Sequence, residues 1–145
     1  GSGSLGLEAL SRGADHAVFV DRADPCLKVL KRNVAALKVG AQATVRKHDL
    51  GRGVAALLSD GPFDLVLVHP PFVLLNHAPG PGEPDVAELL GLIATTAGLL
   101  APEATIAFET PHQCYRAEAD LPELEILRRK EYGSTALFVT KAAKS

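Results

Sequence analysis

A glycine-rich segment at the start of the sequence has the spacing of nucleotide-binding loops. Residues 1–6 read Gly-Ser-Gly-Ser-Leu-Gly and match the pattern G-x-G-x-x-G. Glycine lets a backbone approach a ligand closely, and a helix that follows offers free amide groups at its N-terminus. Asp21, which lies 18 residues after Gly3, is near the spacing at which a carboxylate accepts hydrogen bonds from both ribose hydroxyls of an adenosine cofactor. Glycine-serine runs are also typical of cloning remnants, but the glycines and the acid together favour a cofactor site.

Two further segments place polar residues directly after predicted strands. Asp49 follows residues 43–48, and His69-Pro70-Pro71-Phe72 follows residues 63–68. Because the carboxyl ends of parallel strands line the ligand crevice of an α/β sheet, both segments would lie beside a ligand. A carboxylate at position 49 could accept a hydrogen bond from an adenine amino group. The two prolines would fix the backbone and leave carbonyl oxygens available to a substrate.

The elements that would position these residues alternate between strand and helix. Asp24 is expected to cap a helix that has Pro25 at its first position and Gly40 just past its end. Alternation of this kind predicts a doubly wound α/β sheet in one domain, residues 1–145. The other predicted elements are helices over 5–13, 53–58 and 85–100, strands over 16–21, 43–48, 63–68 and 105–109, a Pro/Gly-rich loop over 76–84, and a closing antiparallel hairpin over 125–130 and 134–140.

Composition excludes several classes of protein. The chain is 47% apolar and 22% charged, which is ordinary for a globular protein and excludes long disorder. No run of 18 apolar residues occurs, so neither a transmembrane helix nor a membrane partner is expected. The two cysteines and five histidines lack the spacing of a disulfide framework or a metal site, so no metal is expected and a reducing, cytoplasmic location fits best.

Charge is distributed unevenly along the chain. Residues 22–47 are basic, residues 48–125 are acidic and residues 126–145 are basic again, although the net charge is only −2. The pattern is that of solvated helix and strand faces or of a split footprint for a polyanion.

Several motifs together resemble one family. Residues 1–14 resemble motif I of the RsmD family, the bacterial 16S rRNA guanine-N2 methyltransferases. Residues 18–21 and 30–33 are similar to the strand and helix that follow in that family, 63–72 to its catalytic strand and 132–137 to its final hairpin. The resemblance covers the whole chain. It implies a Rossmann-like class I methyltransferase fold, mostly parallel with an antiparallel C-terminal hairpin, that binds S-adenosylmethionine.

The resemblance also implies roles for individual residues. The backbone of Gly1 to Gly3 would face the methionine part of the cofactor, Asp21 would hold its ribose, and Asp49 with Leu50 would lie at its adenine. The implied partner is 16S rRNA in a small-subunit assembly particle, bound by a monomeric protein. The predicted catalytic residues are His69, Pro70, Pro71 and Phe72, and the predicted cofactor-binding residues are Gly1, Ser2, Gly3, Ser4, Asp21, Arg22, Asp49, Leu50 and His69.

The sequence departs from the family at the catalytic loop. An exocyclic amine is a poor nucleophile because its lone pair is delocalised into the base. In amino-methyltransferases with an Asp/Asn-Pro-Pro-aromatic loop, the first side chain and a proline carbonyl accept the amine hydrogens, and the aromatic ring stacks on the base. His69 stands at the first position here, and a neutral imidazole accepts one hydrogen bond but brings no negative charge. Three interpretations of His69 follow. Either it is used as a weaker acceptor, or it belongs to a domain that binds the cofactor but has slow or lost catalysis, or the position is an engineered or natural variant.

Other functions stay open at this point. An NAD-binding Rossmann oxidoreductase would also use the glycine loop and Asp21, although the His-Pro-Pro-Phe loop and the closing hairpin fit that class poorly. His69 supports a non-catalytic module that binds the cofactor. Related loops also serve the methylation of adenine or of a protein amide.

The length of the chain leads to one more expectation. In the implied fold the glycine loop follows a first strand near the middle of the sheet, whereas this sequence begins at the loop. Without that strand, its neighbours would leave backbone amides and carbonyls unpaired, at a high cost in free energy. We therefore expect the natural protein to extend upstream, with the RNA-contacting segment of the family, or another chain to supply the strand.

Overall fold

The computed structural model describes residues 1–70, 85–111 and 120–144. Within it the chain forms two compact units, Gly1–Leu50 and Gly51–Ser145, which we describe one at a time. That the whole chain acts as one domain stays a prediction. The predicted loop 76–84 lies outside the described residues.

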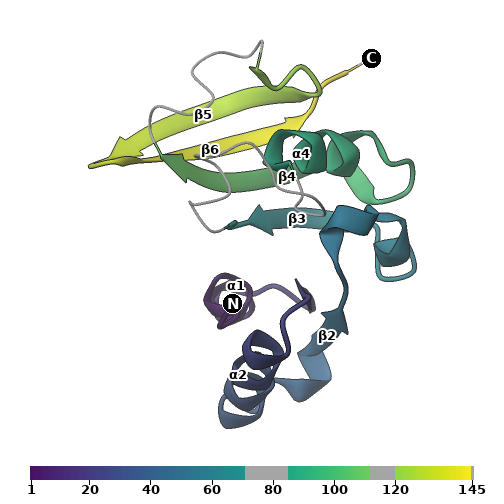
Figure 1. Cartoon of the computed structure of the whole chain (residues 1–145), viewed down its shortest axis with the longest axis vertical. Helices are drawn as coiled ribbons and strands as arrows, with labels where there is room; N and C mark the ends of the chain where they lie inside the picture. The colour runs from purple at the N-terminus through teal and green to yellow at the C-terminus, as the bar shows by residue number, and fades with distance from the viewer. Residues whose placement is uncertain (71–84, 112–119, 145) are drawn as a thin grey trace. The chain divides into compact units, whose positions relative to one another are not determined.

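The first unit is a two-stranded parallel sheet packed against helices (Figure 1). Phe19, Leu30 and Val34 form its buried core, with partly buried aliphatic side chains around them. Its elements in chain order are helix α1 (Ser4–Ser11), strand β1 (Ala17–Asp21), helix α2 (Asp24–Ala36), the 3-10 turn η1 (Gly40–Gln42) and strand β2 (Ala43–Lys47).

The start of α2 differs from the expectation. Ala23, not Asp24, is the N-cap residue, and no side chain caps the helix. Pro25 lies in the first turn as expected, because its missing N–H needs no partner there. The carboxylate of Asp24 instead accepts hydrogen bonds from Lys47 Nζ at 2.8 and 2.9 Å. The ammonium group of a β2 residue therefore binds the carboxylate in place of the backbone N–H groups of the first helical turn.

Both helices of the first unit end in a residue with positive φ. Gly13 has a φ of 107° after α1, as the sequence predicts. After α2 the same role falls to Lys38, with a φ of 57°, two residues before the expected Gly40. The Val39 N–H donates to the Val34 carbonyl at 3.2 Å, which is the six-residue closing bond of a Schellman motif. A lysine therefore takes the left-handed position that the sequence would assign to glycine.

The second unit is a four-stranded sheet with the order β3-β4-β6-β5 (Figure 1). Strands β3 and β4 are parallel, whereas β6 is antiparallel to both β4 and β5, so the closing hairpin is confirmed. The 3-10 turn η2 (Leu50–Arg52) lies at the boundary of the units. The elements that follow are the 3-10 turn η3 (Ala55–Leu57), strand β3 (Phe63–Val68), helix α4 (Val86–Thr95) and strands β4 (Leu100–Pro111), β5 (Leu124–Tyr132) and β6 (Thr135–Ala142).

Alternating side chains give this sheet one buried face and one open face. On the buried face, the rings of Phe108 and Phe138 stack with centroids 5.0 Å apart. Helix α4 contacts β5 and β6 and buries its own apolar side chains. On the open face, Leu65 and Leu67 of β3 are 46% and 37% exposed. The register places them opposite Thr105 and Ala107, which alternate with the buried side chains of β4.

Three element predictions in this unit are wrong in detail. The expected helix 53–58 is a single 3-10 turn, η3. The expected helix 85–100 ends at Thr95, because the Thr96 backbone is extended and Gly98 turns the chain with a φ of 81°. The fourth strand begins at Leu100, not at residue 105. Helices in the described ranges are all too short or too polar to cross a membrane.

The described strands form two separate sheets, in which β1 and β3 are edge strands. β1 pairs only with β2, and β3 pairs only with β4, among the residues that the structure describes. That a further strand pairs with them stays a prediction, while the α/β class with parallel strands and an antiparallel hairpin is confirmed.

Candidate functional site

The glycine loop of the first unit leads directly into α1. Gly3 is the N-cap residue and has a φ of 81°, a left-handed conformation that favours glycine. A Cβ at this position would lie 2.3 Å from Leu30 Cδ1, so the core of the unit also excludes a side chain there. A Cβ on Gly1, by contrast, would meet no atom within 4 Å. Packing therefore explains Gly3, whereas Gly1 leaves open space beside the loop.

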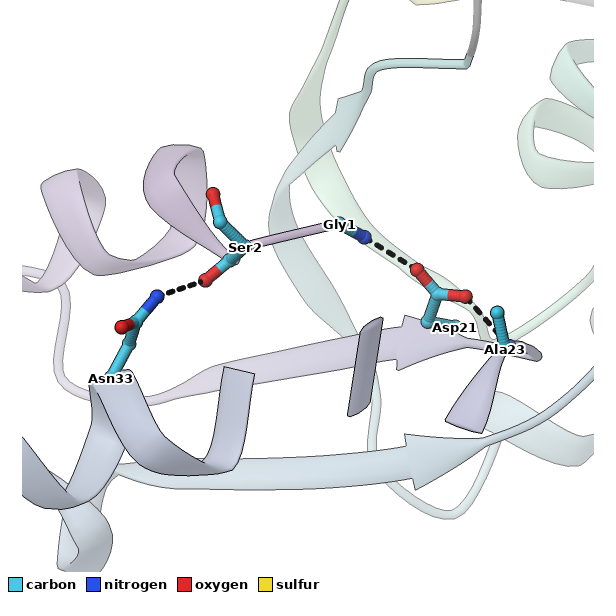
Figure 2. A network of polar contacts seen from close by, with 5 residues as sticks. All are labelled: Gly1, Ser2, Asp21, Ala23 and Asn33. Atoms are coloured by element: carbon cyan, nitrogen blue, oxygen red, sulfur yellow. Dashed lines mark hydrogen bonds and ion pairs between the residues drawn. The ribbon is translucent and has the colours of Figure 1, made fainter. Parts of the chain in front are cut away.

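The Asp21 carboxylate faces this loop from the carboxyl end of β1 (Figure 2). Its Oδ2 accepts a hydrogen bond from the Gly1 amino group at 2.5 Å, and its Oδ1 accepts one from the Ala23 N–H at 2.9 Å. The Asn33 side chain on α2 donates to the Ser2 carbonyl at 3.0 Å and ties the loop to that helix (Figure 2). Asn33 was not among the predicted site residues, although it lies in the segment 30–33 that resembles the family.

These contacts shift both ionisable groups toward their charged forms. Burial opposes the charge on Asp21, but hydrogen bonds from the Gly1 ammonium and the Ala23 N–H outweigh it and lower the pKa of the carboxyl group. Burial likewise opposes the charge on the Gly1 amine, and the hydrogen bond to Asp21 outweighs it and raises the amine pKa. The site therefore holds a carboxylate that is ionised at neutral pH and already accepts a donor from the loop.

This arrangement fits the ribose of an adenosine cofactor. One carboxylate oxygen is used by the chain's own turn at Ala23, while the other points at the loop, where the Gly1 ammonium stands in for a hydroxyl donor. The Asp21 side chain is 19% exposed, so it is shielded yet reachable. Among the described residues around Asp21, none conflicts with the predicted ribose-binding role of its carboxylate.

The adenine-side candidates also lie at the carboxyl end of the two-stranded sheet. Arg22 Nη1 is 3.7 Å from Asp49 Oδ2, and Leu50 follows, half-buried. The His48 N–H donates to the Asp21 carbonyl at 3.1 Å. This bond extends the pairing of β1 and β2 to the residue before Asp49. Asp21 and Asp49 thus follow adjacent strands, as the sequence predicts.

In the second unit, His69 directly follows β3. Its Nε2 lies 3.5 Å from Oε2 of Glu109 on the neighbouring strand β4, and the two side chains are 53% and 42% exposed. Pro70 is half-buried, while Pro71 and Phe72 lie outside the described residues. Glu109 was not predicted as a site residue. Its signal in the sequence is an acid at the end of the apolar run 105–109, the same pattern that identified Asp21.

We found no cluster of three or more His, Cys, Asp or Glu side chains able to hold a metal ion in residues 1–70, 85–111 and 120–144. The polar residues at the strand ends are instead pairs: Gly1 with Asp21, Arg22 with Asp49, and His69 with Glu109.

Comparison with known proteins identifies the family. A family model described as "Conserved hypothetical protein 95", that of the RsmD family, matches residues 1–141. The chain belongs to this family. It is also 32% identical to a Bacillus subtilis (strain 168) protein that carries the provisional name rRNA methyltransferase YlbH, over 97% of the chain and 71% of that protein. The resemblance to the RsmD family is thereby confirmed.

Solved structures of methyltransferases share the fold. An Escherichia coli protein provisionally named methyltransferase yhhF is 28% identical, with a TM-score of 0.73 over 100% of this chain and 72% of the other. The rRNA methyltransferase aviRa from Streptomyces viridochromogenes is 18% identical, with a TM-score of 0.69 over 96% of this chain and 72% of the other, and shows the fold alone. The Rossmann-like methyltransferase fold is confirmed, and the NAD oxidoreductase alternative is not favoured.

Proposed function

We propose that this RsmD-family protein transfers a methyl group from S-adenosylmethionine to the exocyclic N2 amine of a guanine in 16S rRNA during small-subunit assembly. Family membership and the rRNA methyltransferase named among its relatives support an RNA substrate. The pair of His69 and Glu109 at the carboxyl end of β3 and β4 is the observation that carries the proposal.

The first unit supplies the residues that would hold the cofactor. Asp21 accepts hydrogen bonds from the ribose hydroxyls, and Asp49 accepts one from the adenine amino group. Gly1 and Ser2 provide backbone beside the loop, which Asn33 holds in place. When bound, the cofactor supplies an electrophilic methyl group on a positively charged sulfur.

In the second unit, Glu109 compensates for what an imidazole lacks. A carboxylate 3.5 Å from Nε2 favours the tautomer with the proton on Nε2, which leaves the lone pair on Nδ1. His69 Nδ1 can then accept one amine hydrogen and aim the nitrogen lone pair at the methyl group. Glu109 also restores the negative charge that aspartate provides in the family. The distance is longer than a direct hydrogen bond, as is common before a substrate binds.

Pro70 and the proton path complete the arrangement. The Pro70 carbonyl is a second acceptor for the amine, because the following residue is also proline and donates no backbone N–H. Methylation would leave the amine nitrogen positively charged. Its proton passes to Nδ1 of His69, and Glu109 stabilises the resulting imidazolium. An imidazole thus offers a base that an asparagine does not.

A radiolabelled methyl-transfer assay on undermodified small-subunit particles tests this proposal. We expect His69→Ala to lower kcat about 100-fold and Glu109→Gln about 10-fold, the range for a positioned proton acceptor and its partner. Glu103→Gln is the matched control, because Glu103 lies on the same strand and pairs with Lys141 on the surface. A Glu109→Gln variant that methylates as fast as Glu103→Gln would overturn the role of the pair.

His69 itself favours a second candidate function, a module that binds the cofactor but has lost catalysis. In that case the unmodified protein would bind S-adenosylmethionine in a calorimetric titration and label no particle. His69→Asp, which restores the residue of the family, would then be the variant that transfers the methyl group.

A further inference from the structure

One face of the β5–β6 hairpin gathers two cations and an aromatic ring. Side chains two residues apart on a strand point to the same side, so Arg128, Lys130 and Tyr132 share a face. Lys130 Nζ lies 4.8 Å from the centroid of the Tyr132 ring, as this alternation requires. Both basic residues are exposed, and Tyr132 is 52% exposed. We call these three residues the hairpin face.

The other side of the same strand is occupied within the protein. Arg129 lies over the buried Phe138 ring, 5.6 Å from its centroid, and its Nη2 is 2.7 Å from Glu131 Oε1. Glu125, the remaining acid of β5, pairs with Lys141 on the same side as the hairpin face, because the register shifts between Ile126 and Arg128, and its carboxylate lies 3.5 Å from the Lys141 ammonium group. Arg129 is therefore engaged with side chains of the protein itself, whereas Arg128 and Lys130 are exposed on the opposite side of the strand.

The hairpin face is positively charged, whereas the protein as a whole has a small negative net charge. Opposite Arg128 and Lys130 the register places Val139 and Leu137, so β6 presents no acid to them. Within the described part of the chain, neither basic residue forms an ion pair with a carboxylate. Because the whole chain has a net charge of −2, this positive face is a local feature and not a consequence of overall composition.

Strand register connects this face to the proposed reaction site. Lys130 pairs with Leu137, and Leu137 pairs with Glu109, which lies beside His69. These residues form a row across one face of the sheet, at the end of β3 where His69 lies. Three strand spacings of about 4.8 Å separate β3 from β5, so the hairpin face lies about 14 Å from the His69 row.

We propose that the hairpin face binds the RNA substrate next to the target nucleotide, an inference that rests on the proposed function. Arg128 and Lys130 would contact phosphates, and the half-exposed Tyr132 ring would stack on an unpaired base. At about 3.4 Å per stacked nucleotide, 14 Å corresponds to roughly four nucleotides. The bound segment therefore lies about four nucleotides from the methylated guanine.

RNA binding and methylation by the full chain test this surface. Two phosphate contacts to a single strand contribute a salt exponent of about 1.4, which at 0.15 M salt corresponds to a loss of roughly ten-fold in affinity. We expect Arg128→Ala/Lys130→Ala to raise KM for the RNA by that factor with kcat and cofactor affinity unchanged. The slope of log affinity against log salt should become shallower by about 1.4. Tyr132→Ala should weaken binding further, and Tyr132→Phe should not.

The control double variant is Arg12→Ala/Arg52→Ala, which removes the same charge from exposed positions outside the basic segments 22–47 and 126–145. A hairpin variant whose RNA affinity and salt slope equal those of this control would overturn the inference while methylation by the unmodified protein continues. An RNA trimmed to fewer than four nucleotides around the target should make the two double variants equal. If the unmodified protein methylates no RNA but the hairpin variant still loses affinity for it, only the proposed function fails.

Discussion

Close packing between α1 and β1 makes Gly6 the most informative position for a stability test. A Cβ at this position would lie 2.4 Å from Cε1 and 2.9 Å from Cζ of the Phe19 ring. Phe19 is buried and belongs to the core of the first unit, so its ring has little room to move. Gly6→Ala therefore forces a shift of α1 or of the ring.

Two opposing effects determine the size of the change. Overpacking a core by one methyl group costs about 1–3 kcal/mol. Alanine in a helix gains about 1 kcal/mol over glycine. Because a separation of 2.4 Å is far inside van der Waals contact, the upper part of the cost applies, and we expect a net loss of about 1–2 kcal/mol of unfolding free energy.

Gly91→Ala is the matched control, since Gly91 also lies inside a helix, α4. A Cβ there would meet the Glu123 carboxylate at 3.3 Å, and this exposed side chain can move away. We expect this variant to be up to about 1 kcal/mol more stable than the unmodified protein. Urea unfolding followed by circular dichroism gives both free energies.

Phe19→Leu separates the packing argument from a general effect of the substitution. Leucine lacks the two ring atoms nearest to the added methyl group, so Gly6→Ala/Phe19→Leu should be less destabilised than the sum of the single variants, by at least about 1 kcal/mol. If Gly6→Ala is as stable as the unmodified protein and its effect adds to that of Phe19→Leu, the packing argument is wrong.

Two further outcomes concern Asp21. Asp21→Asn removes the charged acceptor and should weaken binding of S-adenosylmethionine about 10-fold or more in a calorimetric titration, without changing the affinity for RNA. The pH dependence of stability should carry a matching signature. The carboxyl pKa is lowered from 3.8, so its contribution is present above that pH and is lost as pH falls through the lower folded value. The Gly1 amine pKa is raised from 8.0, so its contribution is present below that pH and is lost as pH rises through the higher folded value. The difference in unfolding free energy between the unmodified protein and Asp21→Asn should therefore be constant between about pH 5 and pH 7 and shrink as pH falls below about 4; a difference that does not vary as pH falls would contradict this.

Strand ends were predictable from the sequence because a local change of residue type marks them. Asp21 ends the apolar run 16–21 and Asp49 follows the predicted strand 43–48, and the structure places both at the carboxyl end of the two-stranded sheet. The pairing of His69 with Glu109 was not predictable in the same way. The two residues are 40 positions apart, and only the adjacency of β3 and β4 brings them together.

Helix ends were less predictable because they depend on contacts distant in sequence. The pattern around Asp24 is that of a cap, yet Lys47 on β2 takes its carboxylate. Lys38 ends α2 in the left-handed region although Gly40 is close by. Propensity identifies which residue could fill such a position, whereas the closing hydrogen bond from Val39 to Val34 determines which one does.

The open edge of β3 has a consequence for the protein in solution. An unpaired strand edge offers a row of N–H and C=O groups on which another chain can assemble, and charged side chains normally discourage this. Among the described residues of β3 only Asp64 is charged, while Leu65 and Leu67 stand exposed beside it. Concentrated samples are therefore prone to form edge-to-edge aggregates through β3. A further strand paired with this edge would prevent such aggregation, because it would occupy the N–H and C=O groups of β3.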